Sequence, residues 1–531
     1  MDRRTFLKLS GGAAFAGMGG VGCATGATAP GVFRAGPWAD VAARHQEWLL
    51  PTEKQPEGML EVFLVGGLSP WESFYTVPTF CDPAQGGPYS GQQWWTYQEQ
   101  VQGQPSVSEW FSECGGGAGR SLYEPYGIDA AGLNINLGPF ILPLRDRPDL
   151  LARMRVWVVR HDVAPHEVAI PLAMSGHRLG SPRQAALGSH FQRFFGDRAP
   201  ADRAAPYAYA LYMSSMNLAS NGKAAWATGL HRASARPLAI GLGAAAREPA
   251  RLQRQALGAY RAQHDALVQH YLAQYQSRLH NAAAQSLRAP GLHDYEHIRH
   301  ALEKHQALTA LLPPDAFEAD RIPLCVDLPE SPDGKAPDEV KAGLRIAREL
   351  LTAPTDRARY VQLLDSGVWE GLEGLGYDSH EQHVMRGGTN LSHLCQQLAD
   401  SINRPGENNS RKLDLDRHFV LLNTEFGRGP VPEHSPNNPD GTGTDHWPYG
   451  YVIVGFGGFV DEDRAGILGA IGEDSYAIES VTPAEHRAAM LLAMGAWPFA
   501  RESFAIGDVR DASTEEEAAT FLREHVLGYK L

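Results

Sequence analysis

Five short apolar runs, each followed by a glycine or a polar residue, constrain the fold of this 531-residue chain more than any other feature. Runs of four to six residues rich in Val, Leu and Phe are typical of buried β-strands. We expect five strands at Leu60–Val65, Arg155–Arg160, Tyr360–Leu364, His418–Asn423 and Tyr451–Val454.

Stretches with apolar residues at helical spacing separate these runs. Asp338–Leu351 predicts a helix just before the third strand, and Pro249–Ala284 and Tyr295–Leu312 show the same periodicity. Alternating strands and helices indicate an α/β fold in which helices flank a mostly parallel central sheet. We therefore expect one such domain with a helical insertion at about residues 245–315. Segments 82–135 and 403–413 are rich in Gly, Pro, Ser and Asn and are expected to form long loops.

The N-terminus has the features of an export signal. Residues Asp2–Lys8, with sequence DRRTFLK, resemble the twin-arginine motif and precede an uncharged, glycine-rich stretch up to about Ala29. That stretch has too few large apolar residues for a membrane span. We expect residues 1–29 to be a signal peptide read by the twin-arginine translocase, and residues 30–531 to form the folded domain. The expected location is therefore the periplasm or the cell exterior. The alternative interpretation of the motif is that the two arginines occur there by chance and are not an export signal.

The five cysteines leave several possibilities open. Gly20–Cys23 resembles a degenerate lipobox, so a lipid anchor at Cys23 is the only membrane contact that we expect, and cleavage without lipidation is its alternative. No two cysteines have the C-x-x-C spacing of a structural zinc site. A Cys81–Cys114 disulfide and free buried thiols are both compatible with the sequence.

The charge of the chain excludes one class of partner. The formal net charge is −14, and nonspecific nucleic-acid binding depends on an excess of Lys and Arg that neutralise phosphates. We therefore expect no nucleic-acid partner.

Polar residues with catalytic potential follow the predicted strands, where open α/β sheets bind their ligands. Gly66–Gly67 and then Glu72 follow the first strand. His161, His166 and His177 follow the second, and histidine serves both as a metal ligand and as an acid or base near neutral pH. A single one of these residues would more often be structural or solvated, but the group of three histidines favours a site.

Two later regions give a more specific pattern. Asp378 and His380 follow the third strand, and oxygen-plus-imidazole sets suit zinc, manganese or similar ions. Glu425 ends the fourth strand, and Asp445 and His446 follow a loop rich in Asn, Pro and Gly. A carboxylate at a strand end and an Asp-His pair in the next loop can converge on one ion.

Taken in order, these motifs resemble a known family. The motifs are GGLSPWE at 66–72, MSG at 174–176, GYDSH at 376–380, TEFGR at 424–428 and GTDHW at 443–447. The chain resembles, from about Leu60 to Trp497, the bacterial family "domain of unknown function 1501", which is exported by the twin-arginine route and belongs to the alkaline phosphatase-like superfamily. The resemblance implies an alkaline phosphatase-like fold and one or two divalent metal ions.

The resemblance also implies roles for individual residues. Asp378, His380 and His446 would bind one metal, and Glu425 with Glu72 would bind a second. Asp445 would be a ligand or would orient a histidine. Arg428 would face an anionic substrate, since a guanidinium matches phosphate or sulfate, or would fix its loop by a salt bridge.

The nucleophile departs from the pattern of sulfatase-like relatives. Those relatives carry Ser, Thr or modified Cys shortly before a Thr-Gly pair, whereas the matching pair here is Ser175–Gly176 and the upstream position is near His166. Either His166 acts as nucleophile or ligand, or Ser175 or Ser73 takes the role, or activity is lost.

The leading hypothesis is an exported, metal-dependent hydrolase of phosphate or sulfate esters, acting on a small-molecule or glycan ester. The sequence does not distinguish zinc, manganese, calcium and magnesium. One alternative is a non-catalytic exported protein that keeps the fold, with or without one metal, and binds a glycan, a surface polymer or a partner. Another is a structural metal site that only joins loops.

Overall fold

The computed structural model describes residues 43–80, 104–196, 335–368 and 376–530 apart from short gaps, together with short segments between 209 and 325. The described residues all belong to one compact unit within residues 36–531. The expected signal peptide, Cys23 and most of the expected helical insertion lie outside the described residues. These expectations therefore stay predictions.

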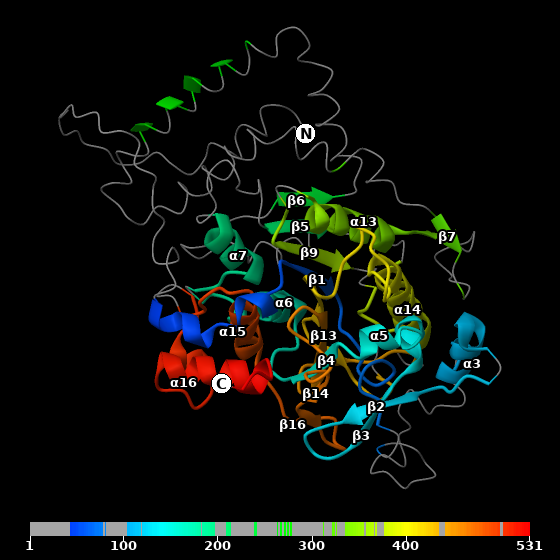
Figure 1. The fold of residues 1–531 in the computed structure, drawn as a ribbon. Coiled ribbons are helices and arrows are strands. Elements are labelled where there is room, and N and C mark those ends of the chain that lie inside the picture. The colour runs from blue at the N-terminus through cyan, green and yellow to red at the C-terminus, as the bar shows by residue number, and fades with distance from the viewer. Residues whose placement is uncertain are drawn as a thin grey trace. The chain divides into compact units, whose positions relative to one another are not determined.

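An eight-stranded mixed sheet forms the centre of the domain (Figure 1). Its order is β14-β4-β13-β10-β1-β9-β5-β6, and every neighbouring pair is parallel except the two that β13 makes. The five predicted strands are confirmed as β1 (Gly58–Leu64), β4 (Met154–Val159), β9 (Tyr360–Asp365), β10 (His418–Thr424) and β13 (Tyr451–Gly457). The remaining three are short strands at the two sides of the sheet, β5 (Tyr209–Met213), β6 (Leu238–Gly241) and β14 (Gly466–Leu468).

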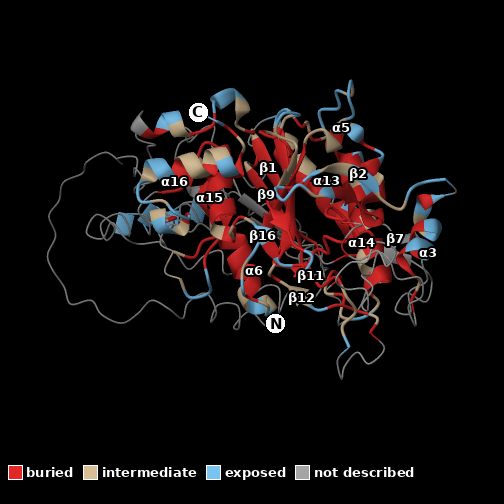
Figure 2. Ribbon diagram, turned by 90° about the horizontal axis from the view of Figure 1, so that it is seen from below, coloured by how far each residue is buried: buried red, intermediate tan, exposed pale blue. Residues whose placement is uncertain are grey.

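Helices cover both faces of this sheet, so the domain has three layers (Figures 1 and 2). One face is covered by α4 (Leu142–Arg145), α13 (Glu339–Thr352) and α14 (His383–Ser401), and α13 confirms the predicted helix at 338–351. The other face is covered by α6 (His166–Ser175), α7 (Leu187–Gly196), α15 (Pro483–Ala493) and α16 (Glu515–Phe521). Figure 2 shows the strands buried between them, as a sheet with two covered faces requires.

Strand β1 shows how the sequence fills both layers. Leu60, Val62 and Leu64 belong to the core under α13 and α14. Met59 and Phe63 belong to the core under α6 and α15, because successive side chains of a strand point to opposite faces.

A buried ion pair lies on the second face. Glu61 and Arg487 of α15 are both buried, and the guanidinium donates to both carboxylate oxygens at 2.8 Å. The Tyr360 hydroxyl and the Asn423 amide also donate to Glu61. Since these partners lie on β9 and β10, the carboxylate ties the three central strands to α15.

The prediction of a loop over 82–135 is wrong for its later part. Ser106 and Glu109 form a capping box that starts α3 (Val107–Phe111). β2 (Glu124–Ile128) and β3 (Asn134–Leu137) pair as a hairpin whose turn is fixed by Asp129, which accepts from the amides of Ala131 and Leu133. These local signals outweigh the Gly and Pro content. The loop predicted at 403–413 is confirmed.

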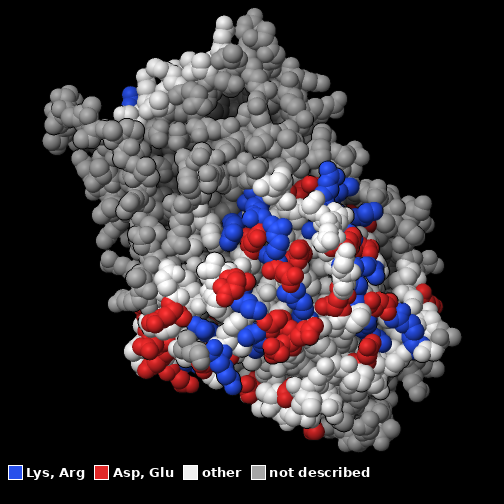
Figure 3. All heavy atoms as spheres, in the orientation of Figure 1, with Lys and Arg blue, Asp and Glu red and all other residues white. Residues whose placement is uncertain are grey.

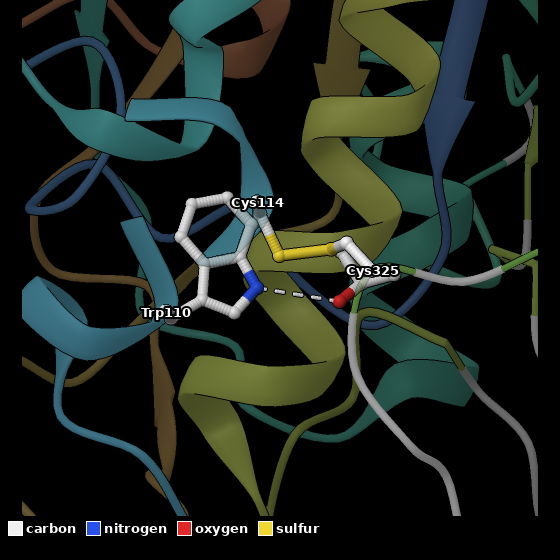
Figure 4. The surroundings of a disulfide bond; sticks show 4 residues. Trp110, Cys114 and Cys325 are labelled. Atoms are coloured by element: carbon white, nitrogen blue, oxygen red, sulfur yellow. Dashed lines mark hydrogen bonds between the residues drawn. A yellow bond between two sulfur atoms is a disulfide. The ribbon is translucent and has the colours of Figure 1, made fainter. Parts of the chain in front are cut away.

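The described cysteines follow neither alternative drawn from the sequence completely. Cys114 is bonded to Cys325, with Cα atoms 5.2 Å apart, and Cys395 is a buried free thiol (Figure 4). Trp110 beside the disulfide donates from Nε1 to Thr389 of α14 at 3.4 Å. The partners are 211 residues apart, so their spacing in the sequence could not indicate the pairing; Cys81 lies outside the described residues.

On the described surface, acidic and basic side chains are mixed over the face in view (Figure 3). Several of them form ion pairs, such as Lys54 with Asp461 at 3.2 Å, of the exposed kind that adds little stability. None of the described helices combines the length and apolar character that a membrane crossing needs.

We predict that Arg487→Met destabilises the domain by about 3–5 kcal/mol, because it leaves the Glu61 carboxylate buried without its counter-ion. The measurement is chemical denaturation followed by circular dichroism. The double variant Glu61→Gln/Arg487→Met removes both charges and should recover part of the loss. A double variant that loses the sum of the two single effects would contradict a direct charge interaction.

Candidate metal centre

The sheet topology brings four segments of the chain to one edge. β4, β9 and β10 run in one direction, so their carboxyl ends meet at the same edge of the sheet. β13 runs the opposite way, so its beginning lies there too. His166, Asp378 and Glu425 follow the three parallel strands, and His446 of β12 (His446–Trp447) precedes β13.

Three histidines converge on the carboxylate of Asp378. The Nε2 atoms of His446 and His380 lie 3.0 and 3.2 Å from Asp378 Oδ1. The Nε2 atom of His166 lies 3.2 Å from Asp378 Oδ2. Asp378 is thus the central group of the cluster.

Two of these histidines are held from behind by carboxylates. His166 Nδ1 lies 2.9 Å from Glu425 Oε1, and His380 Nδ1 lies 2.9 Å from Glu433 Oε2. A carboxylate bonded to the far nitrogen fixes the tautomer and orientation of a metal-binding imidazole. In both His166 and His380, the Nε2 atom is then directed toward Asp378. Glu425 is fully buried and also accepts from the Gly66 amide at 2.7 Å.

The spacing of the donor atoms fits a metal ion. His380 Nε2, His446 Nε2 and Asp378 Oδ1 are 3.0–3.2 Å from one another. Neighbouring ligands of a tetrahedral zinc ion with bonds of about 2.0 Å are about 3.3 Å apart. His166 Nε2 is buried and makes no hydrogen bond of good geometry, although Asp378 lies next to it. His166, Asp378 and His446 can each offer one ligand atom to an ion, and so can His380, Asp445 and His446.

The electrostatics of the cluster favour a positive charge. Burial lowers the pKa of His166, but the adjacent Asp378 and Glu425 carboxylates outweigh it and raise that pKa to about 10. Burial raises the pKa of Asp378, but the hydrogen bonds from His166, His380 and His446 hold it far below its usual range. The bond to Asp378 raises the pKa of His380, whereas burial lowers that of His446. The site therefore stabilises either protons or a cation beside its carboxylates.

Asp445 is exposed at the mouth of the cluster. One of its oxygens lies within 4.8 Å of donor atoms of both His380 and His446. It also accepts from the His446 amide at 2.7 Å, so the carboxylate is held beside the imidazoles.

Arg428 is fully buried beneath the cluster instead of facing solvent. Its guanidinium donates to Asp378 Oδ1 at 2.8 Å, to the Gly66 carbonyl at 3.1 Å and to the Thr444 carbonyl. These contacts join the loops after β1 and β9 to the loop before β13. They match the loop-fixing role that the sequence left open for Arg428.

Ser175 and Glu72 lie in other contacts. Ser175 is buried at the end of α6, where its hydroxyl donates to the Pro171 carbonyl at 2.6 Å. The buried Glu72 contacts Ser69 and His383, and Ser73 donates to the Ser69 carbonyl. The described cluster thus brings together His166, Asp378, His380, Glu425, Arg428, Asp445 and His446.

Two glycines let the backbone segments of the site approach closely. Gly66 has a φ of +113°, and a Cβ there would lie 2.1 Å from the Asp378 amide nitrogen. A Cβ on Gly443 would lie 1.7 Å from the His380 carbonyl oxygen. Residues larger than glycine would therefore displace the loop that carries Asp378 and His380.

Glu433 and Asp365 support the cluster in ways that the sequence did not predict. Glu433 lies in the loop before Asp445, where only its contact with His380 distinguishes it. Asp365 ends β9 and accepts from the Tyr377 hydroxyl at 2.8 Å and from the Gly367 amide at 2.8 Å. It thereby fixes the residue that precedes Asp378.

Comparison with known proteins identifies the family. The family model described as "Protein of unknown function (DUF1501)" matches residues 149–499, which include every residue of the cluster. The chain belongs to the DUF1501 family. No curated protein and no solved structure matches the chain. The family assignment thus agrees with the resemblance seen in the motifs. Because the function of the family is unknown, the activity has to be inferred from the geometry of the site.

Asp365 makes the stability of the domain depend on pH. Burial raises its pKa to about 6, against 3.8 for an aspartate in water. Between these values the folded state holds a proton that the unfolded state releases, so stability falls as the pH rises through this window. We predict that wild type loses about 2 kcal/mol from pH 4 to pH 7 relative to Asp365→Asn.

The measurement is urea denaturation of both proteins across that pH range. Asp400→Asn, at an exposed position, is the control and should follow the wild-type profile. Parallel profiles for wild type and Asp365→Asn would show that Asp365 titrates alike in the folded and unfolded states.

Proposed function

We propose that this protein is a metal-dependent hydrolase of phosphate or sulfate esters that works outside the cytoplasm. The observation that carries the proposal is the convergence of the Nε2 atoms of His166, His380 and His446 on Asp378. Nitrogen-plus-carboxylate sets of this kind suit zinc, manganese or similar divalent ions.

The residues divide into ligands and supports. An ion would be held by His166, Asp378 and His446, or beside them by His380, Asp445 and His446, while Glu425 and Glu433 orient two of the imidazoles from behind. A divalent ion there would polarise the ester and lower the pKa of bound water. Arg428 donates to the proposed metal ligand Asp378 from the buried side. We therefore do not propose that Arg428 binds the substrate.

Water is the proposed nucleophile. The Ser175 hydroxyl is engaged within α6, and His166 uses one nitrogen on Glu425 and turns the other toward Asp378. Asp445 is the exposed carboxylate beside the cluster and can take the proton of an attacking water. Since His166 is the first residue of α6, the amino-terminal end of this helix lies at the site and favours an anionic ester.

The order of the motifs supports a place in the alkaline phosphatase-like superfamily. A mostly parallel sheet with ligands after β4, β9 and β10 agrees with such a fold. The Cys114–Cys325 disulfide supports export, because disulfides persist mainly in oxidising compartments. The twin-arginine translocase would then carry the folded chain.

The rival function is an exported binding protein that keeps a metal without turnover. The observation that favours it is that Ser175 and Arg428 serve structural contacts, which leaves the ester chemistry to water and the ion. The two functions predict the same metal content and differ in hydrolysis.

We predict that the mature protein binds divalent metal stoichiometrically and that Asp378→Ala and His446→Ala abolish this binding. Glu425→Gln should keep the ion but weaken its affinity by roughly 10–100-fold, as expected for a residue that supports a ligand. The measurement is elemental analysis followed by titration of metal-free protein with Zn²⁺ and Mn²⁺. His525→Ala, at an exposed histidine, is the control and should bind as wild type.

The same proteins are then assayed with aryl phosphate and aryl sulfate esters. Turnover that requires metal and is lost in Asp378→Ala supports the hydrolase. Stoichiometric metal without turnover supports the binding protein. A folded wild type that takes up no metal contradicts both.

A further inference from the structure

A second set of buried polar residues lies behind the metal-binding loop. Glu72, Ser379 and His383 are all buried. His383 Nε2 lies 3.3 Å from Glu72 Oε2, and His383 Nδ1 lies 2.7 Å from the Ser379 hydroxyl oxygen. Ser69 donates to the same Glu72 oxygen at 2.5 Å. Three segments, after β1, after β9 and at the start of α14, therefore meet in one chain of hydrogen bonds.

The donors and acceptors in this chain of hydrogen bonds can be assigned. A carboxylate only accepts hydrogen bonds, so the proton of His383 is assigned to Nε2, which donates to Glu72. Nδ1 is then an acceptor, and it takes the hydroxyl proton of Ser379. One imidazole nitrogen thus donates to Glu72 and the other accepts from Ser379. An amide or alkyl side chain at position 383 could not make both hydrogen bonds with this geometry.

Ser379 joins this chain to the metal-binding residues. It stands between Asp378 and His380, and its carbonyl accepts from the Thr444 amide at 3.0 Å. Thr444 directly precedes Asp445 and His446 in the sequence. A shift of Ser379 would therefore move ligands on both loops.

The start of α14 gives the chain a rigid base. The His383 amide donates to the Thr442 carbonyl at 2.9 Å. Gln104 binds the same carbonyl at 2.7 Å and accepts from the Val384 amide at 3.1 Å. α14 continues for 19 residues with much of its length buried, so the loop is anchored to a helix of the core.

We propose that Glu72, His383 and Ser379 are positioning residues that hold Asp378 and His380 in place for the metal, and that Glu72 is not a ligand. The role rests on the proposed metal site. It replaces the ligand role that family resemblance implies for Glu72, because the Glu72 oxygen is directed to Ser69 and His383.

The test is calorimetric titration of metal-free protein with Zn²⁺, with the visible spectrum of the Co²⁺ form as a second readout. Ser379→Ala should bind the same number of ions with affinity reduced roughly 10–100-fold. Its Co²⁺ spectrum should change, because Asp378 and His380 shift. Ser379→Thr keeps the hydroxyl and should restore affinity to within a few-fold. Ser401→Ala, at a buried serine at the far end of α14, is the matched control.

Glu72→Gln separates the two roles of this residue. A positioning residue leaves the number of bound ions unchanged, whereas loss of a ligand would remove an ion. Wild-type affinity and spectrum in Ser379→Ala, or one ion fewer in Glu72→Gln, would overturn the positioning role alone. A wild type that binds no Zn²⁺ would overturn the proposed function and the positioning role with it.

Discussion

The Asp378 carboxylate is surrounded by four basic side chains, and the arrangement of the site depends on how their charges are balanced. His166, His380 and His446 approach it from the mouth, and Arg428 approaches from the buried side. A mostly buried carboxylate is costly unless it is paired. Arg428 supplies one permanent partner, and the imidazoles can bind either protons or an ion. The cluster is therefore built around an anion whose partners on the open side are exchangeable.

The fold delivers these groups through its strand directions. Parallel β4, β9 and β10 end at one edge, and antiparallel β13 begins there. Gly66 and Gly443 then allow the loops to touch where a side chain would keep them apart. Buried pairs such as Glu61 with Arg487 hold the strands beneath in fixed register. The position of the site is thus a consequence of sheet topology, and its fine geometry depends on the buried contacts behind the loops.

Much of this could be predicted from the sequence, since the five central strands and the helix at 338–351 are marked by uninterrupted apolar runs and helical periodicity. That Asp378, His380 and His446 share one ion was a prediction from the resemblance of their motifs to the DUF1501 family. The rest depends on contacts between distant segments. Neither the Cys114–Cys325 pairing nor the bond between Glu433 and His380 has any local signal. Likewise, Glu72 follows β1 as a metal ligand would, and only the position of His383 directs it elsewhere.

The most direct test of the central claim is X-ray absorption spectroscopy at the zinc edge on protein loaded with one equivalent of Zn²⁺. The structure predicts a first shell of nitrogen and oxygen at about 2.0 Å, with the multiple scattering of several imidazoles and no sulfur. His446→Ala should lower the imidazole signal. A first shell of oxygen alone, or a spectrum unchanged by His446→Ala, would show that zinc binds elsewhere and would contradict a metal centre built on Asp378.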